Sequence, residues 1–215
     1  MGDLAGTLIE PEVVRALDQP PTAFREQRFA ASWHPYRHQI AAWKAAADLQ
    51  SRGYIMSSGT GSGKTEGFLV PILNDLVRES RSVGQVVGVR ALFLYPLNAL
   101  INSQRDRLRA WTRSFGGDIR YCLYNGETPS TVKAAEQSAA PEQVLSRALL
   151  RTSPPPILVT NATMLEYMLV RKGDASILAK SQGMLRWIVI DEAHTYIGSQ
   201  AAELSMLLRR VVDAF

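Results

Sequence analysis

The sequence predicts an α/β fold in which a mostly parallel sheet is flanked by helices on both faces. Short apolar runs of strand length alternate along the chain with longer segments of helical periodicity. The strand runs, such as "VRALFLYP" at 89–96 and the four residues 187–190, are continuous apolar runs, so both faces of each strand are expected to be buried. Strands buried on both faces and connected by helices are typical of a parallel sheet between two helical layers.

The composition indicates one soluble domain. The chain has 215 residues, of which 46% are hydrophobic and 20% charged. We divide it into an N-terminal extension at 1–32 and a domain at 33–215. A formal charge of +4 permits nucleic-acid binding without requiring it. The single cysteine, Cys122, excludes an internal disulfide and fits a reducing compartment. No run reaches the roughly 18 apolar residues of a membrane helix. We therefore expect a cytoplasmic location and no membrane contact.

Four elements and a glycine-rich loop are expected in the first third of the chain. A short helix within 10–21 is closed by two prolines, and a second helix covers 34–49. The short run 53–58 is expected to be a strand that stops at the loop, and an amphipathic helix follows at 64–79. The loop therefore is expected to join a strand to a helix.

The remaining elements alternate in the same way. Strands are expected within 89–96, 119–126, 156–160 and 185–191. Helices are expected at the segments that follow most of these strands, namely 97–111, 161–171 and 199–212. The polar, proline-punctuated stretch 127–156 predicts one or two surface helices. Three arginines at helical spacing are expected to form a solvated helix face: Arg105, Arg109 and Arg113.

The glycine-rich loop "SSGTGSGKTEG" at 57–67 predicts a nucleoside triphosphate site. Glycines leave backbone N–H groups open to an anion at a helix N-terminus. Lys64 can reach the terminal phosphates, and the Thr65 hydroxyl can ligate Mg²⁺. The standard pattern G-x-x-x-x-G-K-[ST] has glycine where this chain has Ser58. The alternative is a flexible strand–helix turn. The candidate ATP-binding residues are Ser58, Gly59, Thr60, Gly61, Ser62, Gly63, Lys64 and Thr65.

Two acidic residues follow the last predicted strand. The apolar run 187–190 delivers Asp191 and Glu192 to the carboxyl edge of the sheet, where ligands bind in open α/β folds. Asp191 is expected to hold Mg²⁺, usually through its water shell, and Glu192 to orient and deprotonate the attacking water. A solvated strand end or helix cap is the alternative interpretation. With the loop, this pair predicts hydrolysis of ATP.

Taken together, "GTGSGKT" and "DEAH" resemble motifs I and II of superfamily 2 helicases. The segment "HPYRHQ" resembles the adenine-recognising Gln motif, which implies that Gln39 contacts the adenine edge. The resemblance also implies that His194 links the ATP state to the next motif. The resemblance covers 33–212, and the motif sequences are most like those of the large Lhr-like and YprA-like DNA helicases.

Two further segments resemble helicase motifs that touch the nucleic-acid backbone. "YPLNALINSQ" resembles motif Ia, and "VTNATMLEYML" resembles motif Ic. The residues implied as nucleic-acid contacts are Pro96, Leu97, Asn98, Thr160 and Asn161. The alternatives are local: Asn161 as a helix N-cap, the Pro96 segment as a strand end, Gln39 as an exposed helix residue, and His194 as an ordinary loop residue.

The resemblance implies that 33–215 is the first RecA-like ATP-binding domain of a DNA helicase or translocase. ATP and Mg²⁺ are the implied cofactors, and DNA is the expected partner, with RNA as an alternative. A second RecA-like domain is expected in the full-length protein, because 24 residues follow Asp191 (215 minus 191) and contain no Ser-Ala-Thr motif. Alone, the chain is expected to be nearly inactive. The competing functions are a duplex-DNA translocase in a phage-defence or restriction complex, an RNA helicase domain, and a binding module without turnover.

Overall fold

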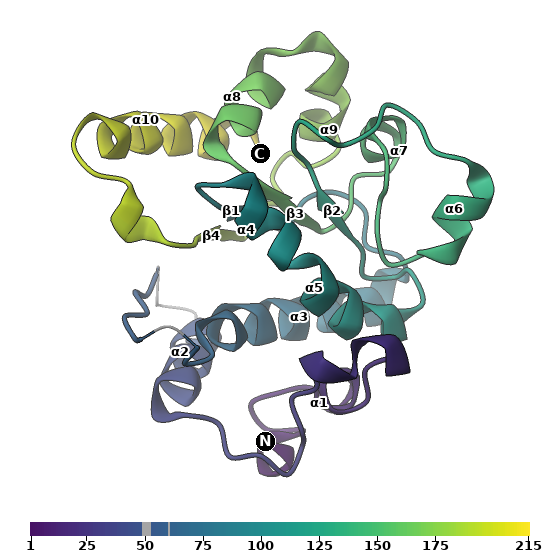
Figure 1. Cartoon of the computed structure of the whole chain (residues 1–215), viewed down its shortest axis with the longest axis vertical. Coiled ribbons are helices and arrows are strands. Elements are labelled where there is room, and N and C mark those ends of the chain that lie inside the picture. The colour runs from purple at the N-terminus through teal and green to yellow at the C-terminus, as the bar shows by residue number, and fades with distance from the viewer. Residues whose placement is uncertain (49–52, 60) are drawn as a thin grey trace.

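A four-stranded, all-parallel sheet lies at the centre of the computed structural model, which describes residues 1–48, 53–59 and 61–215 (Figure 1). The strand order is β2-β3-β1-β4. The strands are β1 (Ala91–Leu94), β2 (Tyr121–Leu123), β3 (Ile157–Thr160) and β4 (Trp187–Ile190). Leu94 lies opposite Thr160 and Ile190, so β1, β3 and β4 end level with one another. The residues that follow these three strands therefore emerge at one edge of the sheet.

Helices cover both faces of the sheet, which confirms the predicted fold class (Figure 1). Alternate residues of β1 enter different cores: Phe93 packs into one, and Leu92 and Leu94 into the other. The first face is covered by α1 (Pro11–Asp18), α3 (Lys64–Val83) and α5 (Arg105–Thr112). The second is covered by α7 (Arg147–Thr152), α8 (Ala162–Val170), α9 (Ala175–Ala179) and α10 (Ser199–Ala214).

Three further helices and five short 3₁₀ turns complete the part of the chain that the structure describes. The helix α2 (Arg37–Ala47) packs on α3. The other two are α4 (Asn98–Ser103) and α6 (Ala134–Ala139). The 3₁₀ turns are Gly2–Leu4, Thr22–Gln27, Arg113–Phe115, Lys172–Asp174 and Ala193–Thr195. Within the described ranges, the chain forms no helix that is both long and apolar enough to cross a bilayer.

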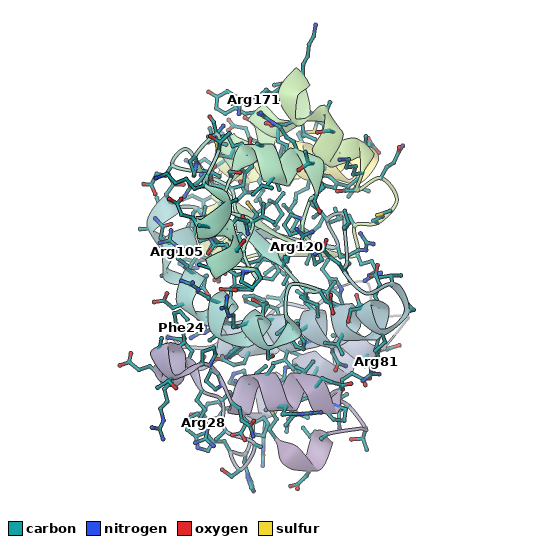
Figure 2. The ribbon with its side chains drawn as sticks, turned by 90° about the vertical axis from the view of Figure 1, so that its right-hand side faces the viewer. Phe24, Arg28, Arg81, Arg105, Arg120 and Arg171 are labelled. Atoms are coloured by element: carbon teal, nitrogen blue, oxygen red, sulfur yellow. The ribbon has the colours of Figure 1, made fainter. Side chains whose placement is uncertain are left out.

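The N-terminal 32 residues pack into the same core as the helices of the domain. Ile9, Val13 and Leu17 are almost fully buried against α3 and α5. The Asn74 side chain of α3 donates to the Leu8 carbonyl oxygen at 3.2 Å. Figure 2 shows Arg28, from this segment, and Arg171 near opposite ends of the molecule. The segment predicted as an extension thus forms one outer layer of the fold.

The substitution Ile9→Val is expected to lower the free energy of unfolding by about 0.5–1.5 kcal/mol, because it removes a buried methylene group. Ile9 is 2% exposed, whereas Ile55 is 96% exposed. The matched control Ile55→Val is therefore expected to change stability by less than about 0.5 kcal/mol. Urea unfolding of the two variants measures the difference. Equal stabilities would show that the N-terminal segment does not contribute to the core.

The strand predicted at 53–58 is wrong: none of the residues 53–59 is in a strand. Instead, the segment runs along α3. The Tyr54 hydroxyl donates to the Gly67 carbonyl oxygen at 3.3 Å, and the Met56 side chain lies against the Cα of Gly67. A strand requires ladder hydrogen bonds with a neighbour, and no other strand of the described chain pairs with this segment.

The single helix predicted at 97–111 is divided into α4 and α5 at Gln104, and the predicted arginine face is only partly solvated. Arg109 and Arg113 both bind the carboxylate of Glu142, whose side chain is fully buried. The Arg109 Nε–Glu142 Oε1 distance is 2.8 Å. Arg105 stays exposed and donates to Asn102. The reason for the difference is the partner, since a buried carboxylate requires cationic hydrogen-bond donors.

Candidate active site

The phosphate loop ends at the N-terminus of α3, as the motif requires. Gly61 and Gly63 have φ angles of 71° and 75°, in the left-handed region that favours glycine. A side chain at Gly63 would be strained by the positive φ, and its Cβ atom would lie 2.4 Å from Gln39 Nε2, which would have to shift. Lys64 is the first residue of α3, a helix of 20 residues whose dipole favours an anion at this end. Thr60 lies outside the described residues.

Hydrogen bonds within the loop fix its shape. The Ser62 hydroxyl donates to the Gly59 carbonyl oxygen at 2.7 Å. The Ser58 hydroxyl, 2.6 Å away, therefore donates to Ser62. Lys64 Nζ donates to the Ser58 carbonyl oxygen at 2.9 Å and so lies across the loop. The serine at the first glycine position of the pattern thus helps to close the loop.

Gln39 joins α2 to the phosphate loop. Its side chain accepts from the Tyr36 backbone N–H at 2.9 Å and donates to the Gly63 carbonyl oxygen at 3.0 Å. It is 1% exposed, which contradicts the alternative of an ordinary exposed residue. Beside it, His38 contacts the Ser62 carbonyl oxygen, and its ring stacks on the Tyr36 ring. Because both ends of the Gln39 amide have protein partners, its contact with adenine stays a prediction.

The acidic pair, Asp191 and Glu192, follows β4 at the carboxyl edge of the sheet, where β1 and β3 also end. The Asp191 backbone N–H donates to the Leu94 carbonyl oxygen at 3.0 Å, which continues the β1–β4 ladder by one residue. Glu192 has a φ of 51° and is the only non-glycine residue of the described chain with a positive φ. Its backbone N–H donates to Asp191 Oδ1 at 2.9 Å. His194 is exposed, and its Nδ1 lies 3.4 Å from Glu192 Oε2.

Burial and nearby charges act on the Asp191 carboxyl. Burial raises the pKa of the Asp191 carboxyl, and the negative charge of Glu192 adds to the rise, while the positive charges of Lys64 and Arg107 lower the pKa. In the described ranges, no three His, Cys, Asp or Glu residues are grouped to hold a metal ion. The predicted ligands Thr65 and Asp191, a hydroxyl and one carboxylate, fit Mg²⁺, which is usually bound by one or two carboxylates together with substrate phosphates and water.

Three residues that the sequence did not single out lie beside this site. Glu66, in the first turn of α3, is 8% exposed, and its Oε1 is 3.9 Å from a guanidinium nitrogen of Arg107 on α5. Glu66 Oε2 and the buried Tyr95 hydroxyl have no hydrogen-bond partner among the described residues. Glu66 directly follows the Lys-Thr pair, which could have marked it. Nothing in the local sequence marks Arg107.

The residues implied as nucleic-acid contacts divide into two groups. Asn161 Oδ1 accepts from the Met164 N–H at 2.8 Å and caps α8, and its Nδ2 donates to Asn98 Oδ1 at 2.7 Å. Leu97 is 62% exposed beside them, after the half-buried Pro96. Thr160, in contrast, is fully buried, and its hydroxyl donates to the Tyr124 carbonyl oxygen. Its side chain therefore cannot serve as the predicted contact in this arrangement.

Comparison with known proteins gives one family. The DEAD/DEAH box helicase family matches the chain over residues 36–214. Among curated proteins, the chain is 26% identical to the Druantia protein DruE of Escherichia coli (strain UMEA 4076-1), covering 82% of this chain and 15% of DruE. It is also 26% identical to the uncharacterized ATP-dependent helicase YprA of Bacillus subtilis (strain 168), covering 82% of this chain and 20% of YprA. The chain thus spans about a fifth or less of these relatives.

A solved structure shows the same fold. The DUF1998 helicase MrfA, crystallised with DNA and AMPPNP, superimposes with a TM-score of 0.64. The match covers 96% of this chain and 24% of the MrfA chain, at 24% sequence identity.

Proposed function

Because the chain belongs to the DEAD/DEAH box helicase family, we propose that it is the ATP-binding motor domain of an ATP-dependent DNA helicase or translocase. The observation that carries the proposal is the placement of the two motifs: the phosphate loop ends at the N-terminus of α3, and Asp191 directly follows β4 at the carboxyl edge of the sheet. The Asn98–Asn161 pair follows β1 and β3 at that same edge. ATP and a nucleic-acid strand would therefore be held by neighbouring loops of one rigid sheet.

The residues divide the work of ATP hydrolysis. The backbone N–H groups of the loop and the Lys64 ammonium group would bind the phosphates, and Thr65 and Asp191 would hold Mg²⁺. When bound, Mg²⁺ neutralises charge that develops on the phosphate oxygens. Glu192 orients a water molecule and accepts its proton as the oxygen attacks the terminal phosphorus. The bond to the leaving ADP oxygen breaks, which releases ADP and phosphate. His194 would link the ATP-bound or ADP-bound state of this site to the next helicase motif.

Nucleic-acid contacts come from the ends of β1 and β3. Asn98 and Asn161 offer amide groups, and the exposed N-terminus of α8 favours an anion. Contacts of this kind bind the backbone and carry little sequence information. One structural neighbour supports DNA, since MrfA was crystallised with DNA and AMPPNP. We further propose that a second RecA-like domain completes the site in the full-length protein, which we place in the cytoplasm.

The test is phosphate release by a protein that contains this chain and its proposed second domain. We expect hydrolysis to rise at least about tenfold when single-stranded DNA is added, since a transition-state group from the second domain contributes a factor of about 10³ to 10⁵. Stimulation by RNA alone would favour an RNA helicase. Movement on duplex DNA without strand separation would favour the translocase of a defence or restriction complex. No stimulation by either nucleic acid would contradict the proposal.

A further inference from the structure

We propose that Arg107 is a positioning residue that couples strand binding at α4 to the phosphate loop through Glu66. The inference rests on the proposed function and adds to it a link between the two sites. Arg107 belongs to α5, which packs beside α4 and begins immediately after it, at Arg105. Arg107 is not one of the residues that the sequence motifs single out.

The first step is the contact between Arg107 and Glu66. A guanidinium nitrogen of Arg107 lies 3.9 Å from Glu66 Oε1, within the range of an ion pair but too far for a hydrogen bond. The Glu66 side chain is 11% exposed, and its Oε2 has no hydrogen-bond partner among the described residues. A buried carboxylate oxygen without a donor is costly. A small movement of α5 toward α3 would supply the donor and give this pair a second arrangement.

The second step is the position of Glu66 beneath the phosphate loop. A Cβ atom on Gly63 would lie 2.9 Å from Glu66 Oε2, so the carboxylate touches the last residue of the loop. The Trp43 indole N–H donates to the Glu66 carbonyl oxygen at 2.9 Å and fixes the backbone there. The arrangement of the Glu66 carboxylate therefore affects the loop directly, through contact and through negative charge beside the phosphates.

The third step is that Arg107 cannot turn away freely. Its guanidinium carbon lies 5.9 Å from the centroid of the Trp111 ring, one turn further along α5. The Trp111 indole N–H in turn donates to the Gln27 carbonyl oxygen at 2.8 Å. The Arg107 guanidinium thus faces Glu66 while Trp111 supports it.

The fourth step joins α5 to the nucleic-acid contacts. Asn98 is the first residue of α4 and is hydrogen-bonded to Asn161. Between α4 and α5 the chain continues without a loop, and Gln104 N–H donates to the Ile101 carbonyl oxygen at 3.2 Å. A strand that displaces Asn98 would therefore move α5 and Arg107 with it. Contacts thus continue from Asn98 through α4 and α5 to Arg107 and Glu66, and a measured coupling between DNA and ATP binding is needed to test whether they transmit it.

The experiment measures two affinities on the 215-residue chain and needs no turnover. A fluorescent ATP analogue with Mg²⁺ is titrated with and without saturating dT₁₂, a 12-nucleotide strand of single-stranded DNA. For the wild type we expect DNA to change the affinity for the analogue at least about fivefold, the lower end of typical coupling. Arg107→Ala should reduce that change to less than about twofold, since the coupling energy is lost. Arg107→Lys should restore part of it.

Two further variants make the result specific. Arg107→Met keeps the packing against Trp111 without the charge and should behave like Arg107→Ala, which separates charge from folding. Arg210→Ala removes an exposed arginine of α10 and should keep the full coupling. Coupling that persists in both Arg107→Ala and Arg107→Met would overturn the inference, as would a wild type that binds both ligands independently. A wild type that binds neither ligand would instead overturn the proposed function, and this inference with it.

Discussion

Replacing Glu192 by glutamine is expected to lower the rate of ATP hydrolysis by a factor of about 10² to 10⁴, the usual contribution of general acid–base catalysis. The amide keeps the size of the side chain and cannot accept the proton of the attacking water. Because Glu192 is not expected to bind the phosphates, the affinity for ATP should stay within about twofold, a change of less than about 0.5 kcal/mol. Single-turnover hydrolysis and nucleotide binding, measured on a protein that includes the second RecA-like domain, separate the two effects.

The matched control for this substitution is Glu203→Gln, an exposed glutamate on α10. The control should hydrolyse ATP at the wild-type rate, because Glu203 lies on α10 and not at the end of β4. If Glu192→Gln also kept the wild-type rate, Glu192 would not be the base. A binding module without turnover would then be the better account of this chain.

Lys64→Ala is expected to weaken binding of Mg²⁺-ATP by about 10- to 100-fold. A hydrogen bond from a charged group contributes about 1.5–3 kcal/mol, and each 1.4 kcal/mol corresponds to about a factor of ten. Lys64 Nζ now donates to two loop carbonyl oxygens, those of Ser58 and Gly59, which positions it beside the expected phosphates. Equilibrium titration with ATP measures the loss.

An exposed lysine of the Lys172–Asp174 turn provides the control for this loss. Lys172→Ala removes the same charge far along the chain from the loop and should leave ATP affinity unchanged. Should Lys64→Ala bind Mg²⁺-ATP as tightly as the wild type, the loop would not be the triphosphate site.

The sequence identified the elements whose signals are local. The strands β1 and β4 lie within the apolar runs predicted at 89–96 and 185–191, although each is shorter than its run. The run 53–58 carries a similar but weaker signal and is not in a strand. Whether an apolar segment becomes a strand depends on a neighbour with which it can pair, and that neighbour lies elsewhere in the chain. Local sequence patterns do not contain this information.

The same distinction applies to charged residues. Arg109 and Arg113 have the spacing of a solvated helix face, yet both bind the buried Glu142, about thirty residues further along the chain. Their pairing is decided by how the 127–156 segment folds back on α5. The spacing along one helix gives no indication of a partner on another segment.

The candidate site was predictable to the extent that its chemistry depends on short motifs. The loop at 57–67 requires particular residue types in a particular order, and Asp191 directly follows a recognisable strand. Asn161 could be seen as a helix cap, which the structure confirms, because its place before α8 is also local. The burial of Thr160 and the approach of Arg107 to Glu66 depend on the packing of separate elements. Only the three-dimensional structure shows them.

The central claim is that the phosphate loop and the acidic pair hold one Mg²⁺-ATP between them. A crystal structure of the chain with Mg²⁺ and a non-hydrolysable ATP analogue tests it most directly. We expect the terminal phosphates over the loop beside Lys64, and the metal ion bound by the Thr65 hydroxyl with Asp191 at its water shell. Triphosphate bound away from the loop, or a metal ion out of reach of Asp191, would contradict the claim.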